Sequence, residues 1–172
     1  MVAVVMFFSS CKDDDPVAPA ATLYDELGGT AMVADPNNAG SQIEKGRLGI
    51  RSVVDSTIFI IAGDSRLTKF FPVLLSEVGA GNLSGFSALS KNLTDFISIG
   101  AGATSYTYTG DSMKDAHDPA KNPRMAEKAA NADMDAFIDD VVKGAKKVGV
   151  PDAQIAKVGA VLESLRADIV QK

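Results

Sequence analysis

Apolar residues that recur every three or four positions constrain the fold of this chain more than any other feature. Four stretches show this period, within residues 50–61, 89–97, 134–148 and 155–169. Side chains at such spacing lie on one face of an α-helix and are buried together. We therefore expect four amphipathic helices and an all-α fold. The apolar positions are Ile50, Val53, Val54, Ile58 and Ile61; Leu89, Leu93, Phe96 and Ile97; Met134, Phe137, Ile138, Val141, Val142, Ala145 and Val148; and Ile155, Val158, Leu162, Leu165 and Ile169.

Turn-forming residues separate the last two stretches. Gly149 follows the third stretch, and Pro151 with Asp152 precedes the fourth. This order is typical of one helix ending and another beginning, so we expect a hairpin of two packed helices. We expect Ser84 or Ser87 to cap the helix that contains the second stretch.

The segments between these helices have no regular period. Residues 105–109, Ser-Tyr-Thr-Tyr-Thr, have the composition of a strand. No second strand is available to pair with them, so we expect an extended loop. We also expect irregular structure within 30–47, 76–86, 98–110 and 118–130, and long loops of this kind are often functional.

Length, charge and cysteine content exclude several classes of protein. A chain of 172 residues suits one domain. The net charge of −5 and the absence of a basic run argue against a nucleic-acid partner. One cysteine and one histidine cannot supply an internal disulfide, a multi-cysteine zinc or iron–sulfur site, or a His-rich metal centre.

The N-terminal segment resembles the end of a bacterial lipoprotein signal. Residues 1–8 are apolar but too few to span a bilayer. Ser9 and Ser10 precede Cys11, and a Lys-Asp-Asp-Asp run follows it. The resemblance implies that Cys11 is lipidated, and the acidic run resembles an export tag of surface lipoproteins in some Gram-negative bacteria. The alternative is an apolar terminus with a chance cysteine.

These features predict three parts of the chain. Residues 1–11 are expected to be a signal remnant, 12–22 a flexible tether and 23–172 the folded domain. Because no basic residue precedes the apolar run, we expect the true start to lie upstream of Met1. The expected location is the cell envelope, at the outer membrane or cell surface of a Gram-negative bacterium, with only a lipid anchor in the membrane.

Glycine-rich segments do not support a phosphate-binding loop. The spacing of Gly79, Gly81 and Gly85 is one residue too wide for a dinucleotide fingerprint, and Gly100 and Gly102 lack a third glycine. No strand precedes either segment, and no serine lies in a G-x-S-x-G turn. These residues are therefore expected to be ordinary loop glycines.

Three carboxylates surround the single histidine. Asp111, Asp115 and Asp118 flank His117, and residue type alone allows a carboxylate–imidazole metal site. Acidic residues at a helix start more often complement the helix dipole. We therefore favour a different role for His117.

The segment around His117 resembles a known motif. Residues 108–117 read Tyr-Thr-Gly-Asp-Ser-Met-Lys-Asp-Ala-His. This resembles the segment that carries the proximal haem ligand in the truncated haemoglobins, most closely those of group I. Tyr-Thr-Gly, Met-Lys and the histidine all match the spacing of that family.

Other segments are similar to the same family in the same order. The resemblance runs from about residue 22 to residue 170, with apparent insertions near 30–47 and 118–130. The matching segments are Leu-Tyr-Asp-Glu-Leu-Gly-Gly at 23–29, Asp-Ser-Arg-Leu at 64–67 with Phe70 and Phe71, Gly-Val-Pro at 149–151, and Leu-Glu-Ser-Leu-Arg at 162–166.

The resemblance implies a truncated globin fold, a two-over-two helical sandwich with long loop insertions, that binds haem b (iron protoporphyrin IX). It implies His117 as the iron ligand, with Nδ1–H donating to a carbonyl one turn earlier, that of Met113 or Lys114. Taken singly, the other candidates are also compatible with plain core or a solvated face. The implied haem cage comprises Ile58, Phe71, Leu74, Leu75, Leu89, Leu93, Phe96, Ile97, Met113 and Phe137, and the candidates for the propionates are Tyr108, Lys114, Lys91 and Arg124.

The chain departs from the family on the side where gas binds. Ile58 takes the place of the family's tyrosine and Leu93 that of its glutamine. We therefore expect an apolar distal pocket, weak or short-lived oxygen binding and retained carbon monoxide binding. Thr57, Asn92 or Lys91 could supply a donor. Nitric oxide or peroxide detoxification would need such a donor, and enzyme activity is not expected.

The functional hypothesis is therefore a lipid-anchored haem protein. It would reversibly bind a diatomic gas, oxygen, nitric oxide or carbon monoxide, or sense one, with a redox partner that the sequence does not identify. The alternative is a surface lipoprotein that kept the globin-like helices without haem and acts as a structural or binding module.

Overall fold

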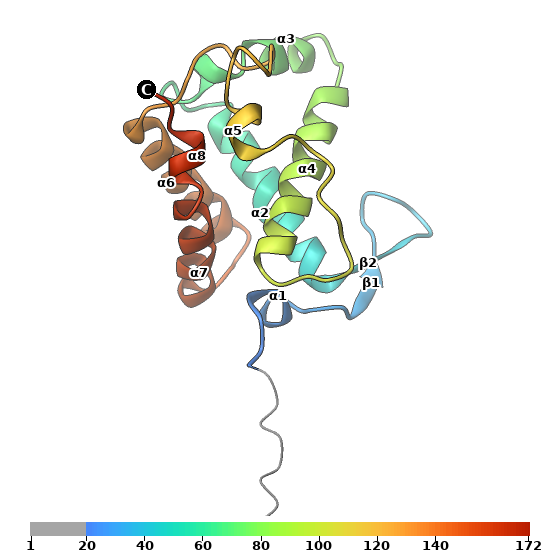
Figure 1. The fold of residues 1–172 in the computed structure, drawn as a ribbon. Coiled ribbons are helices and arrows are strands. Elements are labelled where there is room, and N and C mark those ends of the chain that lie inside the picture. The colour runs from blue at the N-terminus through green and yellow to red at the C-terminus, as the bar shows by residue number, and fades with distance from the viewer. Residues whose placement is uncertain (1–19) are drawn as a thin grey trace, which may run out of the picture.

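The computed structural model describes residues 20–172, and four long helices form its body (Figure 1). They are α2 (Lys45–Ile61), α4 (Ser84–Gly100), α6 (Asn131–Lys147) and α7 (Asp152–Glu163). The first two periodic stretches lie within α2 and α4, the third lies in α6 except for Val148, and the fourth begins in α7 and ends in α8. The all-α prediction is confirmed.

Shorter elements connect these helices. The 3₁₀ turn η1 and helix α3 lead from α2 to α4, α5 lies between α4 and α6, and α8 follows α7. The bounds are α1 (Leu23–Glu26), β1 (Met32–Ala34), β2 (Gln42–Glu44), η1 (Thr68–Phe70), α3 (Pro72–Gly79), α5 (Met113–Ala116) and α8 (Arg166–Ile169).

Part of the predicted N-terminal organisation cannot be compared with the structure. Cys11, the predicted signal remnant at 1–11 and most of the predicted tether lie outside the described residues. Within residues 20–172, no helix is both long enough and apolar enough to cross a membrane.

Helix α2 lies between the other long helices. It packs most extensively against α6 and next against α4, while α6 also packs against α7. The pairs α2/α4 and α6/α7 therefore form two layers that meet where α2 crosses α6 (Figure 1).

Both core clusters contain residues of α2. Val53 and Ile61 join a cluster with α6 and α7, whereas Ile50, Val54 and Ile58 join a cluster with Tyr24 and α4. Burial of apolar side chains on two sides explains why this helix has so wide an apolar face.

A short hairpin replaces part of the irregular stretch expected at 30–47. Strands β1 and β2 pair antiparallel, with Val33 opposite Ile43. The Asp35 side chain accepts a hydrogen bond from the Asn37 amide at 2.9 Å and pairs with Arg51, which stabilises the turn. Strands of three residues are too short to show a period of two, so the pattern was missed.

Three helix boundaries differ from the sequence prediction. Neither Ser84 nor Ser87 caps α4: Leu83 holds the cap position, and the Ser84 amide donates to Asn82 Oδ1 at 3.1 Å. Helix α3 begins at Pro72 and includes residues 76–79. The last helix is interrupted before α8, where the Ser164 hydroxyl donates to the Val161 carbonyl and competes with the helical hydrogen bonds.

The crossing of α2 and α6 depends on a glycine. A Cβ atom on Gly144 would lie 2.5 Å from Thr57 Oγ1 and 3.0 Å from the Thr57 nitrogen. Thr57 is fully buried and its hydroxyl donates to the Val53 carbonyl at 2.8 Å. Neither helix can move away without opening the core.

Replacing this glycine is expected to destabilise the protein. Gly144→Ala should lower the free energy of unfolding by about 1–3 kcal/mol because it overpacks the crossing. Gly159→Ala in α7 is the matched control, since no atom lies within 4 Å of its Cβ position. That control should gain up to about 1 kcal/mol from helix propensity. Urea unfolding measures both changes, and equal stability of the two variants would contradict the argument.

A buried ion-pair network joins α2 to α4. Asp95 is 4% exposed and accepts hydrogen bonds from Arg47 and, at 2.7 Å, from Lys91. The Arg47 guanidinium also lies 4.2 Å from the centre of the Tyr106 ring. Burial by itself raises the pKa of Asp95, but the hydrogen bonds from Lys91 and Arg47 outweigh it and lower the pKa.

The lowered pKa predicts how stability depends on pH. Because the folded-state pKa of Asp95 lies below the unfolded value of about 3.9, its ion pairs stabilise the fold above that pH. Their contribution is lost as the pH falls through the folded-state pKa. Asp95→Asn should therefore cost about 3 kcal/mol at pH 7 and distinctly less at pH 3, measured by urea unfolding. Asp168→Asn, at an exposed position, is the control; a loss that is independent of pH would refute this account.

Candidate functional site

One large cavity lies between α4, α5, α6 and the loop of residues 118–130. Its volume is about 570 Å³, within the usual range of small-molecule sites. Side chains from the end of α2, from η1 and from α3 complete the wall, and most of the lining is apolar. The cavity therefore suits a ligand with a large apolar surface.

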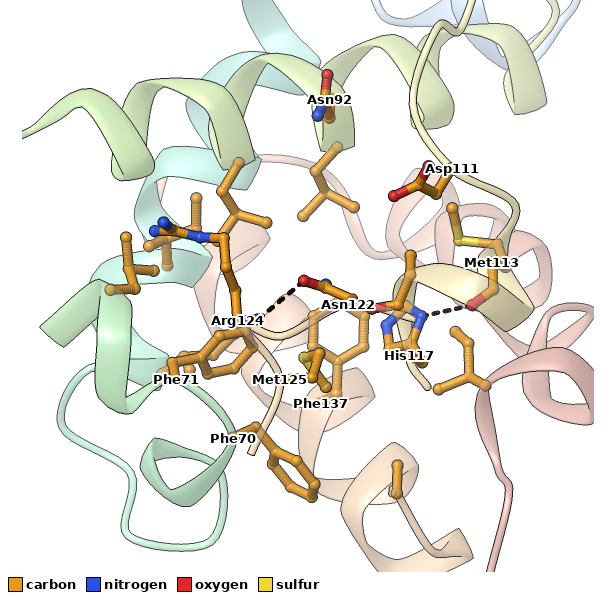
Figure 2. A pocket seen from close by; sticks show the side chains of 18 of the residues that line it. Phe70, Phe71, Asn92, Asp111, Met113, His117, Asn122, Arg124, Met125 and Phe137 are labelled. Carbon is orange, nitrogen blue, oxygen red and sulfur yellow. Dashed lines mark hydrogen bonds between the residues drawn. The ribbon is translucent and has the colours of Figure 1, made fainter. Parts of the chain in front are cut away.

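His117 faces this cavity from the end of α5 (Figure 2). Its Nδ1 lies 2.8 Å from the Met113 carbonyl oxygen. A carbonyl only accepts, so Nδ1 carries the hydrogen and Nε2 keeps a free lone pair. The position agrees with the expected hydrogen bond to a carbonyl one turn earlier.

The surroundings keep this imidazole neutral. Burial lowers the pKa of His117, and the hydrogen bond to the Met113 carbonyl raises it by a smaller amount. The net result is a pKa below the ordinary value, and a neutral imidazole is the form that binds a metal.

The wall formed by α2 and α4 is mostly apolar, with Ser84 and Asn92 of α4 as its polar members. Ile58 and Ile61 come from α2, and Leu89, Leu93 and Phe96 come from α4. The expectation of an apolar wall at Ile58 and Leu93 agrees with this arrangement.

Only one of the three suggested donors lines the cavity. Asn92 is a lining residue on the α4 side, across from His117 (Figure 2). Thr57 is buried at the α2/α6 crossing, and Lys91 pairs with Asp95. Neither the Thr57 hydroxyl nor the Lys91 ammonium group is therefore available as a donor in the cavity.

Most of the residues proposed as a haem cage line the cavity. Two do not, Ile97 and Leu75; Ile97 is 3% exposed within the core cluster of Tyr24. Lys114, a candidate for the propionates, is exposed on α5 and does not line the cavity either. Helical periodicity placed Ile97 on the apolar face but could not tell the core from the cavity wall. The lining residues are Ile58, Phe71, Leu74, Leu89, Leu93, Phe96, Tyr108, Met113, His117 and Phe137.

Two more residues that sequence reasoning considered have other contacts. Tyr108 lies at the cavity, but its hydroxyl donates to the Asp111 carbonyl at 2.8 Å and its ring packs edge-on against Phe96. Leu75 is not among the lining residues, although its neighbour Leu74 is.

The loop after His117 forms part of the wall, which sequence reasoning missed except at Arg124. Asn122, Arg124 and Met125 all line the cavity (Figure 2). Arg124 makes a two-armed ion pair with Glu77 of α3, with distances of 2.9 Å and 2.6 Å. The position of this loop directly after His117 was the one signal that could have identified these residues.

The carboxylates near His117 do not form a metal cluster. Within residues 20–172, no group of three or more His, Cys, Asp or Glu side chains is arranged to hold a metal ion. Asp118 instead accepts a hydrogen bond from the Ala120 amide at 3.0 Å. A metal ion bound to His117 would therefore need most of its other ligands from a cofactor rather than from these carboxylates.

The donor set fits haem. Haem iron needs one axial protein ligand, and His117 offers a neutral imidazole oriented by its own hydrogen bond. The porphyrin needs an apolar cavity with aromatic side chains, which Phe71 and Phe137 supply. Arg124 lies at the wall and is the candidate cation for a propionate there, although its guanidinium is paired with Glu77.

Comparison with known proteins identifies the fold. No protein-family model and no curated protein matches the chain. Several solved structures are similar, among them truncated haemoglobin from Tetrahymena pyriformis in its Fe(III) form and two single-residue variants of it. Each has a TM-score of 0.60 and 22% sequence identity and covers 88% of this chain and 100% of its own. The chain therefore has the truncated haemoglobin fold.

Proposed function

We propose that this protein binds haem b through His117 and reversibly binds a diatomic gas. The observation that carries the proposal is the His117 imidazole, which is oriented by the Met113 carbonyl and faces an apolar cavity of about 570 Å³. Bound haem would supply an iron atom with a free position for oxygen, nitric oxide or carbon monoxide.

The residues of the chain would orient the iron ligand, enclose the porphyrin and neutralise the propionates. The hydrogen bond from Nδ1 keeps the lone pair of Nε2 available and limits rotation of the ring. Phe71, Phe137 and the leucines of α4 give the cavity an apolar surface against which a porphyrin would pack. Arg124 is the cation among the lining residues, and it would have to share its ion pair with Glu77 to hold a propionate. Lys91 pairs with Asp95 and does not line the cavity, and Lys114 does not line it either.

The mostly apolar α4 side favours reversible gas binding over a reaction of the bound gas. A donor near the gas stabilises charge on oxygen and is needed for dioxygenase or peroxidase activity. Leu89 and Leu93 occupy most of this side, and Asn92 is the one amide among the α4 residues of the lining. This supports weak or short-lived oxygen binding, carbon monoxide binding and the absence of turnover.

Location and subfamily rest on the sequence. The Ser9-Ser10-Cys11 segment and the acidic run after it support a lipid anchor at Cys11 and display at the cell envelope. The Tyr-Thr-Gly to His117 motif supports an assignment to group I of the truncated haemoglobins.

Haem binding can be tested with the full chain and haemin. The protein should show a sharp Soret band, and His117→Gly should lose the bands of histidine-ligated iron because the chain has no other histidine. Added imidazole should restore those bands in His117→Gly, since it refills the space of the ring. Absorption spectra before and after reduction are the measurement.

Lys114→Ala is the matched control on the same helix. Lys114 is exposed and outside the cavity, so its removal should leave the spectrum unchanged. A spectrum of free haemin for the unsubstituted protein would refute the proposal and favour a haemless scaffold that binds another partner.

The apolar α4 side can be tested by adding a donor. Leu93→Gln should slow oxygen dissociation about fivefold, because one hydrogen bond contributes about 1 kcal/mol. Carbon monoxide dissociation should change little. Flash photolysis and stopped-flow mixing measure both rates. Leu93→Met is the control of similar volume without a donor, and the same slowing in Leu93→Met would show that polarity is not the cause.

A further inference from the structure

The helix that carries His117 is too short to hold itself in place. Helix α5 has four residues, none of them buried, and single-turn helices are unstable alone. Its N-terminus is capped by the Ser112 hydroxyl, which accepts from the Asp115 amide. Its carbonyls therefore need partners from elsewhere in the chain.

Each carbonyl of α5 has a donor. The Met113 carbonyl accepts from His117 Nδ1, and the Asp115 carbonyl accepts from the backbone of His117 and Asp118. These donors lie within four residues of the carbonyls that they contact.

The other two carbonyls accept from side chains farther along the chain. Gln171 Nε2 donates to the Lys114 carbonyl at 2.8 Å, across 57 positions of sequence. Asn122 Nδ2 donates to the Ala116 carbonyl at 2.8 Å. Two amide side chains thus hold α5 from different directions.

Gln171 is itself held firmly. Its backbone amide donates to the Ala129 carbonyl at 2.9 Å, and Val170 forms a β-bridge with Ala129. Its side-chain Nε2 also donates to the Asp168 carbonyl at 3.2 Å. Lys172 pairs with Glu127 at 2.6 Å, which ties the same segment to the loop before α6. The amide that reaches α5 is therefore anchored to the rest of the fold.

We propose that Gln171 is a positioning residue for His117. By holding the Lys114 carbonyl, it fixes the rotation of α5, and with it the Met113 carbonyl that orients the imidazole. The effect on bound iron rests on the proposed haem function, but the effect on α5 does not. Asn122 makes the equivalent contact at Ala116 but also lines the cavity, so Gln171 is the cleaner residue to test.

The test on the haem-free protein uses Gln171→Glu. This change keeps the shape of the side chain but replaces the donor with a carboxylate oxygen that repels the Lys114 carbonyl. Hydrogen exchange of the Ala116 and His117 amides, followed by NMR, should be about fivefold faster or more, the effect of losing one hydrogen bond. Gln42→Glu, at an exposed position in β2, has the same charge change and should leave this exchange unchanged. Unchanged exchange in Gln171→Glu would overturn the proposal.

A second readout uses the haem-loaded protein. In reduced Gln171→Glu, the iron–histidine stretching band in the resonance Raman spectrum should shift or broaden, and haem should transfer to a scavenger several-fold faster. A purely structural role would lower the melting temperature without moving that band.

The two experiments separate the two hypotheses. If neither the unsubstituted protein nor Gln171→Glu binds haem, but the Ala116 and His117 amides exchange faster in Gln171→Glu, the positioning role is supported and the proposed function is refuted. If both proteins bind haem, and Gln171→Glu changes neither the iron–histidine band nor the amide exchange, the proposed function is supported and the positioning role is refuted.

Discussion

The burial of α2 on two sides is the constraint on which the rest of the structure depends. Gly144 allows α6 to approach the α2 backbone, and Thr57 fills the contact without leaving its hydroxyl unpaired. With α2 fixed, α4 packs against its other side and Asp95 ties the two together. The cavity is the space that remains between α4 and the layer of α6 and α7, so its existence follows from this crossing.

The helices were predictable because their apolar faces repeat over several turns. The stretches at 50–61 and 89–97 fall inside α2 and α4, and the stretch at 134–148 extends one residue beyond α6. Short features were not predictable for the same reason: the three-residue strands have no measurable period, and the break before α8 depends on one hydroxyl at Ser164. Periodicity also identified Ile97 as apolar but could not say whether it faced the core or the cavity.

The site was predictable where a motif carried it and not where tertiary contacts did. The resemblance of residues 108–117 to the family motif implied a hydrogen bond from His117 to the Met113 or Lys114 carbonyl, and the partner is Met113. The loop of 118–130 has no period, and its path depends on contacts with distant residues, such as the Arg124–Glu77 ion pair. Asn122 and Met125 therefore reached the cavity without a signal in the sequence.

The α2 side and the α4 side of the cavity wall differ in how closely they are tied to the core. Ile58 and Ile61 of α2 belong to the two core clusters as well as to the wall, so a substitution there alters stability and ligand affinity together. Leu89 and Leu93 of α4 are only partly buried beside the core. The polarity of the cavity can therefore be changed on the α4 side while the two core clusters remain intact.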